Sequence, residues 1–175
     1  MVTGMVARLH VQELVVSQDY GQFYLTTDED IDGGVLLDDA YANGGVGQEE
    51  PGFDVLVRTP HQNNFELGLR VELWNGRPPD DLDDWQEASE AWVEVTDFGL
   101  WYGSPIQEYH RLEVPPGEYA VRIAGRGLTH WGWPGTTTPG DTWRIQLWPS
   151  DEPFPARKLR TWSGWEPLRN GQNVR

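Results

Sequence analysis

The stretch FELGLRVEL, residues 65–73, decides the fold. Its apolar residues stand at every second position, and charged residues or glycine stand between them. Because successive side chains of a strand point to opposite faces of a sheet, this alternation predicts a half-buried antiparallel strand. The strand has one face on a core and the other toward water.

A hairpin is expected at residues 109–123, where the turn signal Pro115-Pro116-Gly117 separates two alternating runs. Further extended segments are expected at 6–16, 20–26, 53–58, 92–96 and 143–148. Loops are expected at 27–34, 38–52, 75–90 and 126–140, and a short helical turn at 82–91. The number and spacing of the strands predict an all-β fold, an antiparallel β-sandwich of eight or nine strands.

A chain of 175 residues suits a single domain. We expect the sandwich to occupy residues 1–152. Residues 153–175 are basic, contain proline and lack periodicity, so they predict a partly ordered tail that Trp162 and Trp165 help to dock. The absence of cysteine, of a secretory signal and of a long apolar run predicts a cytoplasmic protein that does not enter a membrane.

The charge is strongly acidic, with 28 Asp and Glu against 13 Lys and Arg and a net charge of −15. Residues 153–175 carry a net charge of +4, so residues 1–152 carry −19. Such a field repels nucleic acid and anionic membranes and attracts basic protein surfaces. The simpler alternative is that the charge only keeps the protein soluble.

Motifs for catalysis, metals and cofactors are missing from the sequence. The four histidines are scattered, and no Gly-x-Ser-x-Gly or phosphate-binding loop occurs. Residues 28–33 resemble a calcium loop, but Asp39 stands where the bidentate Glu belongs. We therefore expect a protein that is not an enzyme and that binds no metal or cofactor, although a carboxylate in a dry pocket would reopen the question.

Three acidic segments are the sharpest candidates for binding a basic protein. Like charges packed closely cost stability unless water or a partner's cations match them. The first segment consists of Asp80, Asp81, Asp83, Asp84 and Glu87, with Trp85 as an expected anchor. The second consists of Asp28, Glu29, Asp30 and Asp32, and the third of Asp38, Asp39, Glu49 and Glu50. The alternative for each segment is a solvated loop.

Tryptophan is enriched, with ten in the chain. Those on expected strands belong by default to the core or to a sheet face. Trp101, Trp131 and Trp133 lie in or beside expected loops, where aromatic rings stack on sugars, anchor a protein interface or cap the ends of the sandwich. They support an alternative function, a β-sandwich module that binds a ligand or carbohydrate.

Several motifs, in a fixed order over residues 7–148, resemble the competence protein J family. They are Gln12-Glu13-Leu14 with Ser17, Tyr20-x-Gln22-Phe23, Tyr41-Ala42, Leu112-x-Val114-Pro115-Pro116-Gly117-x-Tyr119 and Asp141-Thr142-Trp143-x-Ile145. The resemblance implies a small cytoplasmic inhibitor of a DNA-entry nuclease, or the related role of an immunity protein against a toxin. It transfers no contact residue, and the acidic loop 75–90 and the basic tail are additions to the family pattern.

Overall fold

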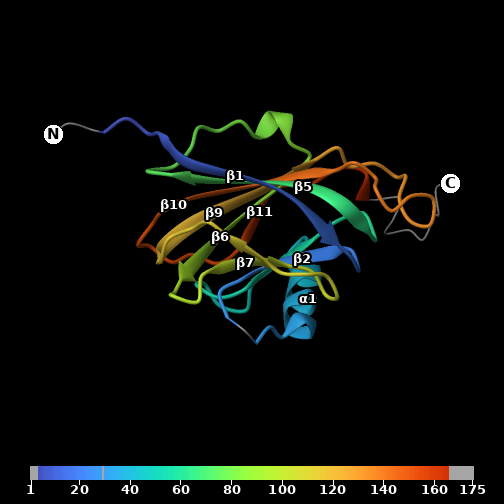
Figure 1. Ribbon diagram of the computed structural model, residues 1–175, viewed down its shortest axis with the longest axis horizontal. Helices are drawn as coiled ribbons and strands as arrows, with labels where there is room; N and C mark the ends of the chain where they lie inside the picture. The colour runs from blue at the N-terminus through green and yellow to red at the C-terminus, as the bar shows by residue number, and fades with distance from the viewer. Residues whose placement is uncertain (1–3, 29, 166–175) are drawn as a thin grey trace.

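The computed structural model describes residues 4–28 and 30–165. In this part of the chain eleven strands form two packed sheets (Figure 1). The larger sheet has the order β1 (Arg8–Gln18), β5 (Asn64–Trp74), β10 (Thr142–Pro149), β9 (Gly117–Arg126), β6 (Glu87–Val95) and β11 (Arg157–Arg160). The smaller has the order β3 (Val46–Gly47), β4 (Val55–Arg58), β2 (Gln22–Thr26), β7 (Leu100–Gly103) and β8 (His110–Leu112). The predicted all-β sandwich is confirmed, but the described residues form eleven strands where eight or nine were expected, because short strands such as β3 and β7 carry too few residues to show alternation.

The core lies between the two sheets, and the alternation of residues 65–73 builds one side of it. Leu67, Leu69 and Val71 of β5 point inward and are fully or almost fully buried. Phe23 of β2 meets Trp143 of β10 across the core, edge to face, with ring centroids 5.2 Å apart. The alternation of apolar residues along β5 therefore predicted correctly which of its faces is buried.

The larger sheet departs from the predicted antiparallel arrangement at one place. Strands β5 and β10 run parallel, with Thr142 opposite Gly68. The other pairs of this sheet in the described residues are antiparallel. Apolar and polar residues alternate in the same way along parallel and antiparallel strands. The sequence pattern of one strand therefore does not reveal in which direction its neighbouring strand runs.

Helix α1 (Gly33–Ala42) was not predicted; it covers part of the outer face of the smaller sheet (Figure 1). Leu36 and Ala40 of the helix pack on Tyr24 and Leu56 of the sheet. The helix lies where loops were expected at 27–34 and 38–52. Neither this helix nor the 3-10 turn η1 (Leu82–Asp84), the helical elements of the described residues, is long and apolar enough to span a bilayer.

The expected helical turn at 82–91 is limited to η1, and from Glu87 onward the chain forms β6. The expected tail begins inside the sandwich, because Arg157–Arg160 forms β11 at the edge of the larger sheet. Trp162 packs against the core and Trp165 is buried. Residues 166–175 of the expected tail lie outside the described residues.

Candidate functional site

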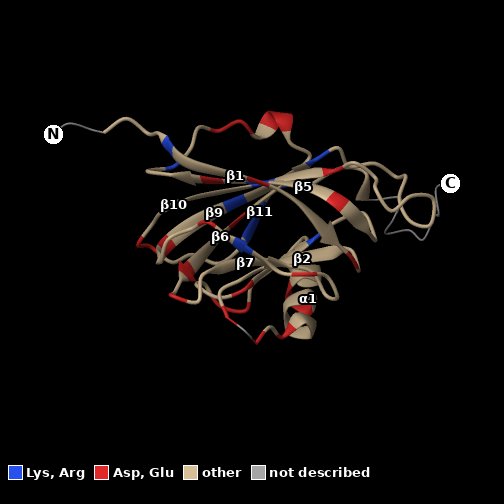
Figure 2. Cartoon of the chain, viewed as in Figure 1, with Lys and Arg blue, Asp and Glu red and all other residues tan. Residues whose placement is uncertain are grey.

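Acidic side chains from two loops line one groove beside α1, at the end of the smaller sheet where β2 ends and β4 begins. The loops are the one between β2 and α1 and the one between β3 and β4. The groove has a volume of about 320 Å³. Figure 2 shows the acidic segments gathered along this side of the molecule. We call it the acidic groove; it is lined by Asp28, Asp30, Asp32, Leu36, Glu49, Glu50, Phe53 and Asp54.

Hydrogen bonds fix the loop after β2. Thr27 N–H donates to Asp54 Oδ1 at 3.0 Å, which ties this loop to the approach to β4. The Thr26 hydroxyl donates to the Asp28 carbonyl at 2.6 Å. Asp32 caps the start of α1, with its Oδ1 accepting from Val35 N–H at 3.1 Å. Asp32, expected to contact a partner, thus also holds the helix.

The loop after β3 is fixed mainly by the buried side chain of Gln48. Its amide donates to the carbonyls of Phe53 at 3.1 Å and Trp92 at 2.8 Å. Gly52 pairs with Trp92 on β6 by a backbone hydrogen bond of 2.8 Å. The chain around Phe53 is therefore held on the edge of the sandwich, and the Phe53 ring stays 55% exposed.

The acidic groove has no internal counter-charge in the described residues. None of its carboxylates forms an ion pair with a described Lys, Arg or His. Burial raises the pKa of Asp54, the Thr27 N–H and Thr26 lower it in part, and nearby Asp28 raises it further. A cationic group entering the groove would relieve this repulsion.

The segment from Asp80 to Glu87 was expected to be an exposed acidic patch, but part of it is buried or paired with cations of the protein itself. Arg144 of β10 binds Asp81 through two hydrogen bonds, of 2.6 and 2.7 Å, and lowers the pKa of that carboxyl. Trp85 is buried, with the guanidinium groups of Arg126 and Arg144 each 4.4 Å from its ring. It is therefore not an exposed anchor, and that expectation is corrected.

Glu87 also turns inward, which corrects its expected exposure. Its carboxylate accepts from Lys158 Nζ, from Trp162 N–H and from Trp165 Nε1. Asp80, Asp83 and Asp84 stay exposed on or next to η1. The acidic segment from Asp80 to Glu87 is therefore partly neutralised by cations of the protein itself.

Glu29 of the second acidic segment lies outside the described residues.

The third acidic segment is divided between the groove and the helix. Glu49 and Glu50 line the acidic groove, while Asp38 is exposed on α1. Asp39 accepts from Gln48 N–H at 2.8 Å and so joins α1 to β3. Sequence reasoning missed Phe53, which it placed in a strand. The acidic residues close on both sides of Phe53 were the signal that could have identified it.

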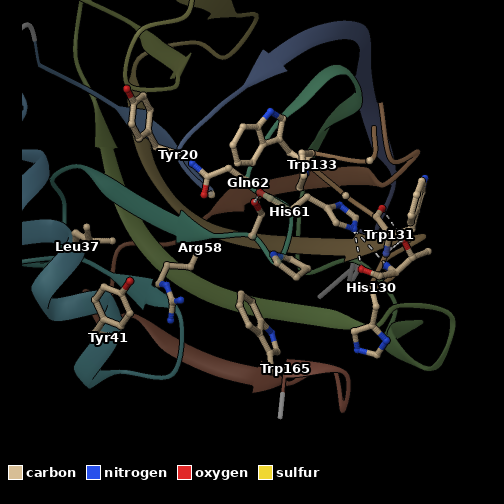
Figure 3. A pocket seen from close by; sticks show the side chains of 17 residues that line it. Tyr20, Leu37, Tyr41, Arg58, His61, Gln62, His130, Trp131, Trp133 and Trp165 are labelled. Carbon is tan, nitrogen blue, oxygen red and sulfur yellow. Dashed lines mark hydrogen bonds between the residues drawn. The ribbon is translucent and has the colours of Figure 1, made fainter. Parts of the chain in front are cut away.

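The three tryptophans that were expected in or beside loops lie at two different sites. Trp131 and Trp133 are exposed and line a second groove (Figure 3). Trp101 lies on β7, where its Nε1 donates to the Phe98 carbonyl at 2.9 Å and its ring packs beside that of Phe98. The structure therefore brings together two of the three candidate ligand-binding tryptophans.

A histidine and an aspartate lie in contact inside the sandwich. His61 Nδ1 is 2.7 Å from Asp141 Oδ1, and both side chains are almost completely buried. Burial would raise the pKa of Asp141, but hydrogen bonds from His61, Trp143 and Asn64 outweigh it and lower the pKa. With neither side chain accessible, the pair joins the link between β4 and β5 to the start of β10. No described group of three His, Cys, Asp or Glu side chains is placed to hold a metal ion.

No family model matches the chain, and no curated protein matches it in sequence. Among solved structures, ComJ from Bacillus subtilis, an inhibitor of the DNA degrading activity of NucA, resembles it with a TM-score of 0.57 and 15% identity, over 84% of this chain and 100% of that one. The product of crocagin biosynthetic gene J resembles it with a TM-score of 0.50 and 14% identity, over 82% and 99%. The resemblance to the competence protein J family, inferred from sequence motifs, is thus supported for the fold.

Proposed function

We propose that this protein is an inhibitor that binds a basic partner protein, of the nuclease or toxin class, and covers its active surface. One observation carries the proposal. Carboxylates from two loops line one groove together with the exposed ring of Phe53, and no described cation of the chain pairs with them.

The chemistry of a nuclease explains why such a surface would bind it. A nuclease must attract phosphate, so its active surface is basic, and an acidic protein can occupy it in place of the nucleic acid. The net charge of −15 would accelerate encounter over a distance of about a Debye length. Phe53 would then supply the desolvated aromatic contact that gives such an interface much of its affinity.

The structural likeness to ComJ supports the choice of a nuclease, because that protein inhibits the DNA degrading activity of NucA. In the proposed mode of action the protein blocks by occupation, catalyses no reaction, uses no cofactor and meets its partner in the cytoplasm. Asp30, Glu49 and Glu50 would face the cations of the partner, while Asp32 keeps its cap on α1.

The experiment compares two variants with equal loss of charge. The groove variant carries Asp30→Asn, Glu49→Gln and Glu50→Gln, and the control carries Asp80→Asn, Asp83→Asn and Asp84→Asn around η1. Each is added to an extract of the source cells, and the rate of plasmid DNA degradation is measured. We expect the wild type and the control to inhibit degradation, and the groove variant to need about 10-fold more protein or more for the same inhibition.

Equal loss of inhibition in both variants would show that only overall charge matters. Loss in the control alone would move the contact to the η1 segment. An extract in which the wild type does not slow DNA degradation at any concentration would contradict the choice of a nuclease.

A further inference from the structure

A second groove lies away from the acidic groove and shares no lining residue with it. It has a volume of about 740 Å³, within the range of small-ligand sites. Its walls come from the turn before β2, from α1, from the link between β4 and β5, and from the loop between β9 and β10 (Figure 3). We call it the aromatic groove; its main side chains are Tyr20, Tyr41, Arg58, Gln62, Trp131 and Trp133.

Four large aromatic rings are exposed in this one groove. Tyr20, Tyr41, Trp131 and Trp133 are between 57% and 62% exposed. A single exposed aromatic residue is ordinary, but a cluster in a concave site marks a binding surface. In Figure 3 Tyr20 and Trp133 lie on one side of the groove and Tyr41 on the other, so a ligand would meet rings from both sides.

The loop that presents the tryptophans is held in place before any ligand arrives. Trp131 N–H donates to the Thr129 hydroxyl at 3.2 Å, and the Thr129 carbonyl lies 3.0 Å from Nε2 of the buried His61. The Trp131 ring packs against Gly135, where an added Cβ would come within 2.7 Å of it. Such fixed aromatic side chains lose little conformational entropy on binding.

The charge of the aromatic groove contrasts with the rest of the molecule. The chain has 28 Asp and Glu, but none of those in the described residues lines this groove. Arg58 is one of the described lining residues, and its guanidinium lies 4.0 Å from the Tyr41 ring and 5.1 Å from the Trp165 ring. The described lining of the groove therefore offers no carboxylate to a basic protein surface, and the field of the whole molecule disfavours an anionic ligand.

We propose that the aromatic groove binds a neutral oligosaccharide. The C–H face of a pyranose ring is apolar and packs flat on an aromatic side chain, while its hydroxyl groups project from the rim. Trp133 and Tyr41 supply such faces, and the Gln62 amide supplies hydrogen-bonding groups beside them. A charged or purely apolar ligand would use only one of these two features.

The test titrates the full chain with cellohexaose, chitohexaose, maltohexaose and xylohexaose, followed by tryptophan fluorescence and calorimetry. We expect at least one of them to bind, with an affinity that added sodium chloride leaves unchanged. Trp133→Ala and Tyr41→Ala should each weaken binding about 10-fold. Phe53→Ala, an exposed ring of the acidic groove, is the matched control and should leave sugar binding unchanged.

Three results would overturn the proposal: no binding of any of the four sugars at about 5 mM, equal loss in Phe53→Ala, or retained sugar binding in Trp133→Ala and Tyr41→Ala. If Trp133→Ala fails to fold by circular dichroism, Tyr41→Ala on the opposite wall decides. Loss of nuclease inhibition in Trp133→Ala, without any sugar binding, would instead assign the groove to a protein partner. Failure of nuclease inhibition itself leaves the sugar result unaffected, because the two grooves share no residue.

Discussion

At the scale of single residues, carboxylates of the same type behave in opposite ways. Asp141 is buried, yet hydrogen bonds from His61, Trp143 and Asn64 lower its pKa. Asp54 is less buried, but burial and the nearby charge of Asp28 outweigh the hydrogen bond that it accepts from Thr27 N–H, and its pKa is raised. The partners of a carboxylate decide whether its charge supports the fold or opposes it.

Asp54→Asn should stabilise the protein at neutral pH. Because the folded-state pKa of Asp54 is raised, its contribution to stability is fully present below its ordinary pKa, near 4, and is lost as the pH rises through the folded value. Asparagine keeps the acceptor for Thr27 N–H without the charge. Urea unfolding should show a more stable variant at pH 7 and no difference from wild type at about pH 3. A gain that persists unchanged at low pH would contradict this account.

Two cations of β11 should differ in their importance. Lys158 is the cation that binds the buried Glu87, whereas Arg157 shares the buried Glu90 with Arg77 and Arg122. Lys158→Ala should therefore cost about 3 kcal/mol of unfolding free energy, because it leaves a buried carboxylate without its cation. Arg157→Ala should cost at most about 1 kcal/mol. Denaturant unfolding measures both, and equal costs would show that the buried carboxylates are not held as described.

The same contacts explain why part of the site escaped prediction. Trp85 and Glu87 look like exposed residues of an acidic loop, but Arg144 and Lys158, which neutralise that segment, come from β10 and β11. A sequence shows which residues are charged, but the cations that neutralise a given carboxylate can come from strands far away in the sequence. For Asp28 and Asp30 the sequence predicted an exposed side chain correctly, because no described cation pairs with either of them.

At the scale of elements, period-two alternation was enough to identify β5, β9 and β10, because each has one face on the core. Helix α1 was missed because Asp32 and the glycines after it read as part of an acidic turn, although Asp32 is the cap of the helix. Strand β11 was missed because Arg157–Arg160 has no apolar alternation. Buried carboxylates of β6 hold it instead.

The contact between α1 and β3 depends on Gly47. A Cβ at this position would lie 2.1 Å from the Leu36 carbonyl oxygen and 2.9 Å from Ala40 N. Gly47→Ala should therefore displace the helix and cost about 2–3 kcal/mol. Gly34→Ala, inside the helix and without close backbone atoms of other elements, is the control and should stabilise by about 0.5–1 kcal/mol. Thermal unfolding should give shifts of opposite sign, and a neutral Gly47→Ala would contradict the close packing.

At the scale of the whole molecule, charge is carried on two separate surfaces. The acidic groove lies beside α1, and the exposed carboxylates of η1 lie on the far side of the sandwich (Figure 2). The strong net charge was evident from composition, and so was the location of acid in the loop after β2. The joining of that loop with Glu49, Glu50 and Phe53 into one groove required the fold.

Added salt should stabilise this protein at neutral pH. With a net charge of −15, repulsion within the folded molecule opposes compaction, and mobile ions screen it. Raising sodium chloride from about 0.02 to about 0.5 M should raise Tm by about 2–4 °C. The increase should largely vanish near pH 4.4, the isoelectric point that the amino-acid composition predicts. A Tm that falls with salt at pH 7 would show that ion pairs such as Arg144–Asp81 outweigh the repulsion.

The parallel pairing of β5 with β10 also has a kinetic consequence. In the described residues it joins an antiparallel block, β1–β5, to the block of β10, β9, β6 and β11. Its partners are remote in the sequence, so a large loop must close before their contacts contribute. We therefore expect the joining of the two blocks to limit the rate of refolding. Substitutions at Gly68 or Thr142 should then lower the folding rate by a larger factor than they raise the unfolding rate, as measured from the two arms of a chevron plot.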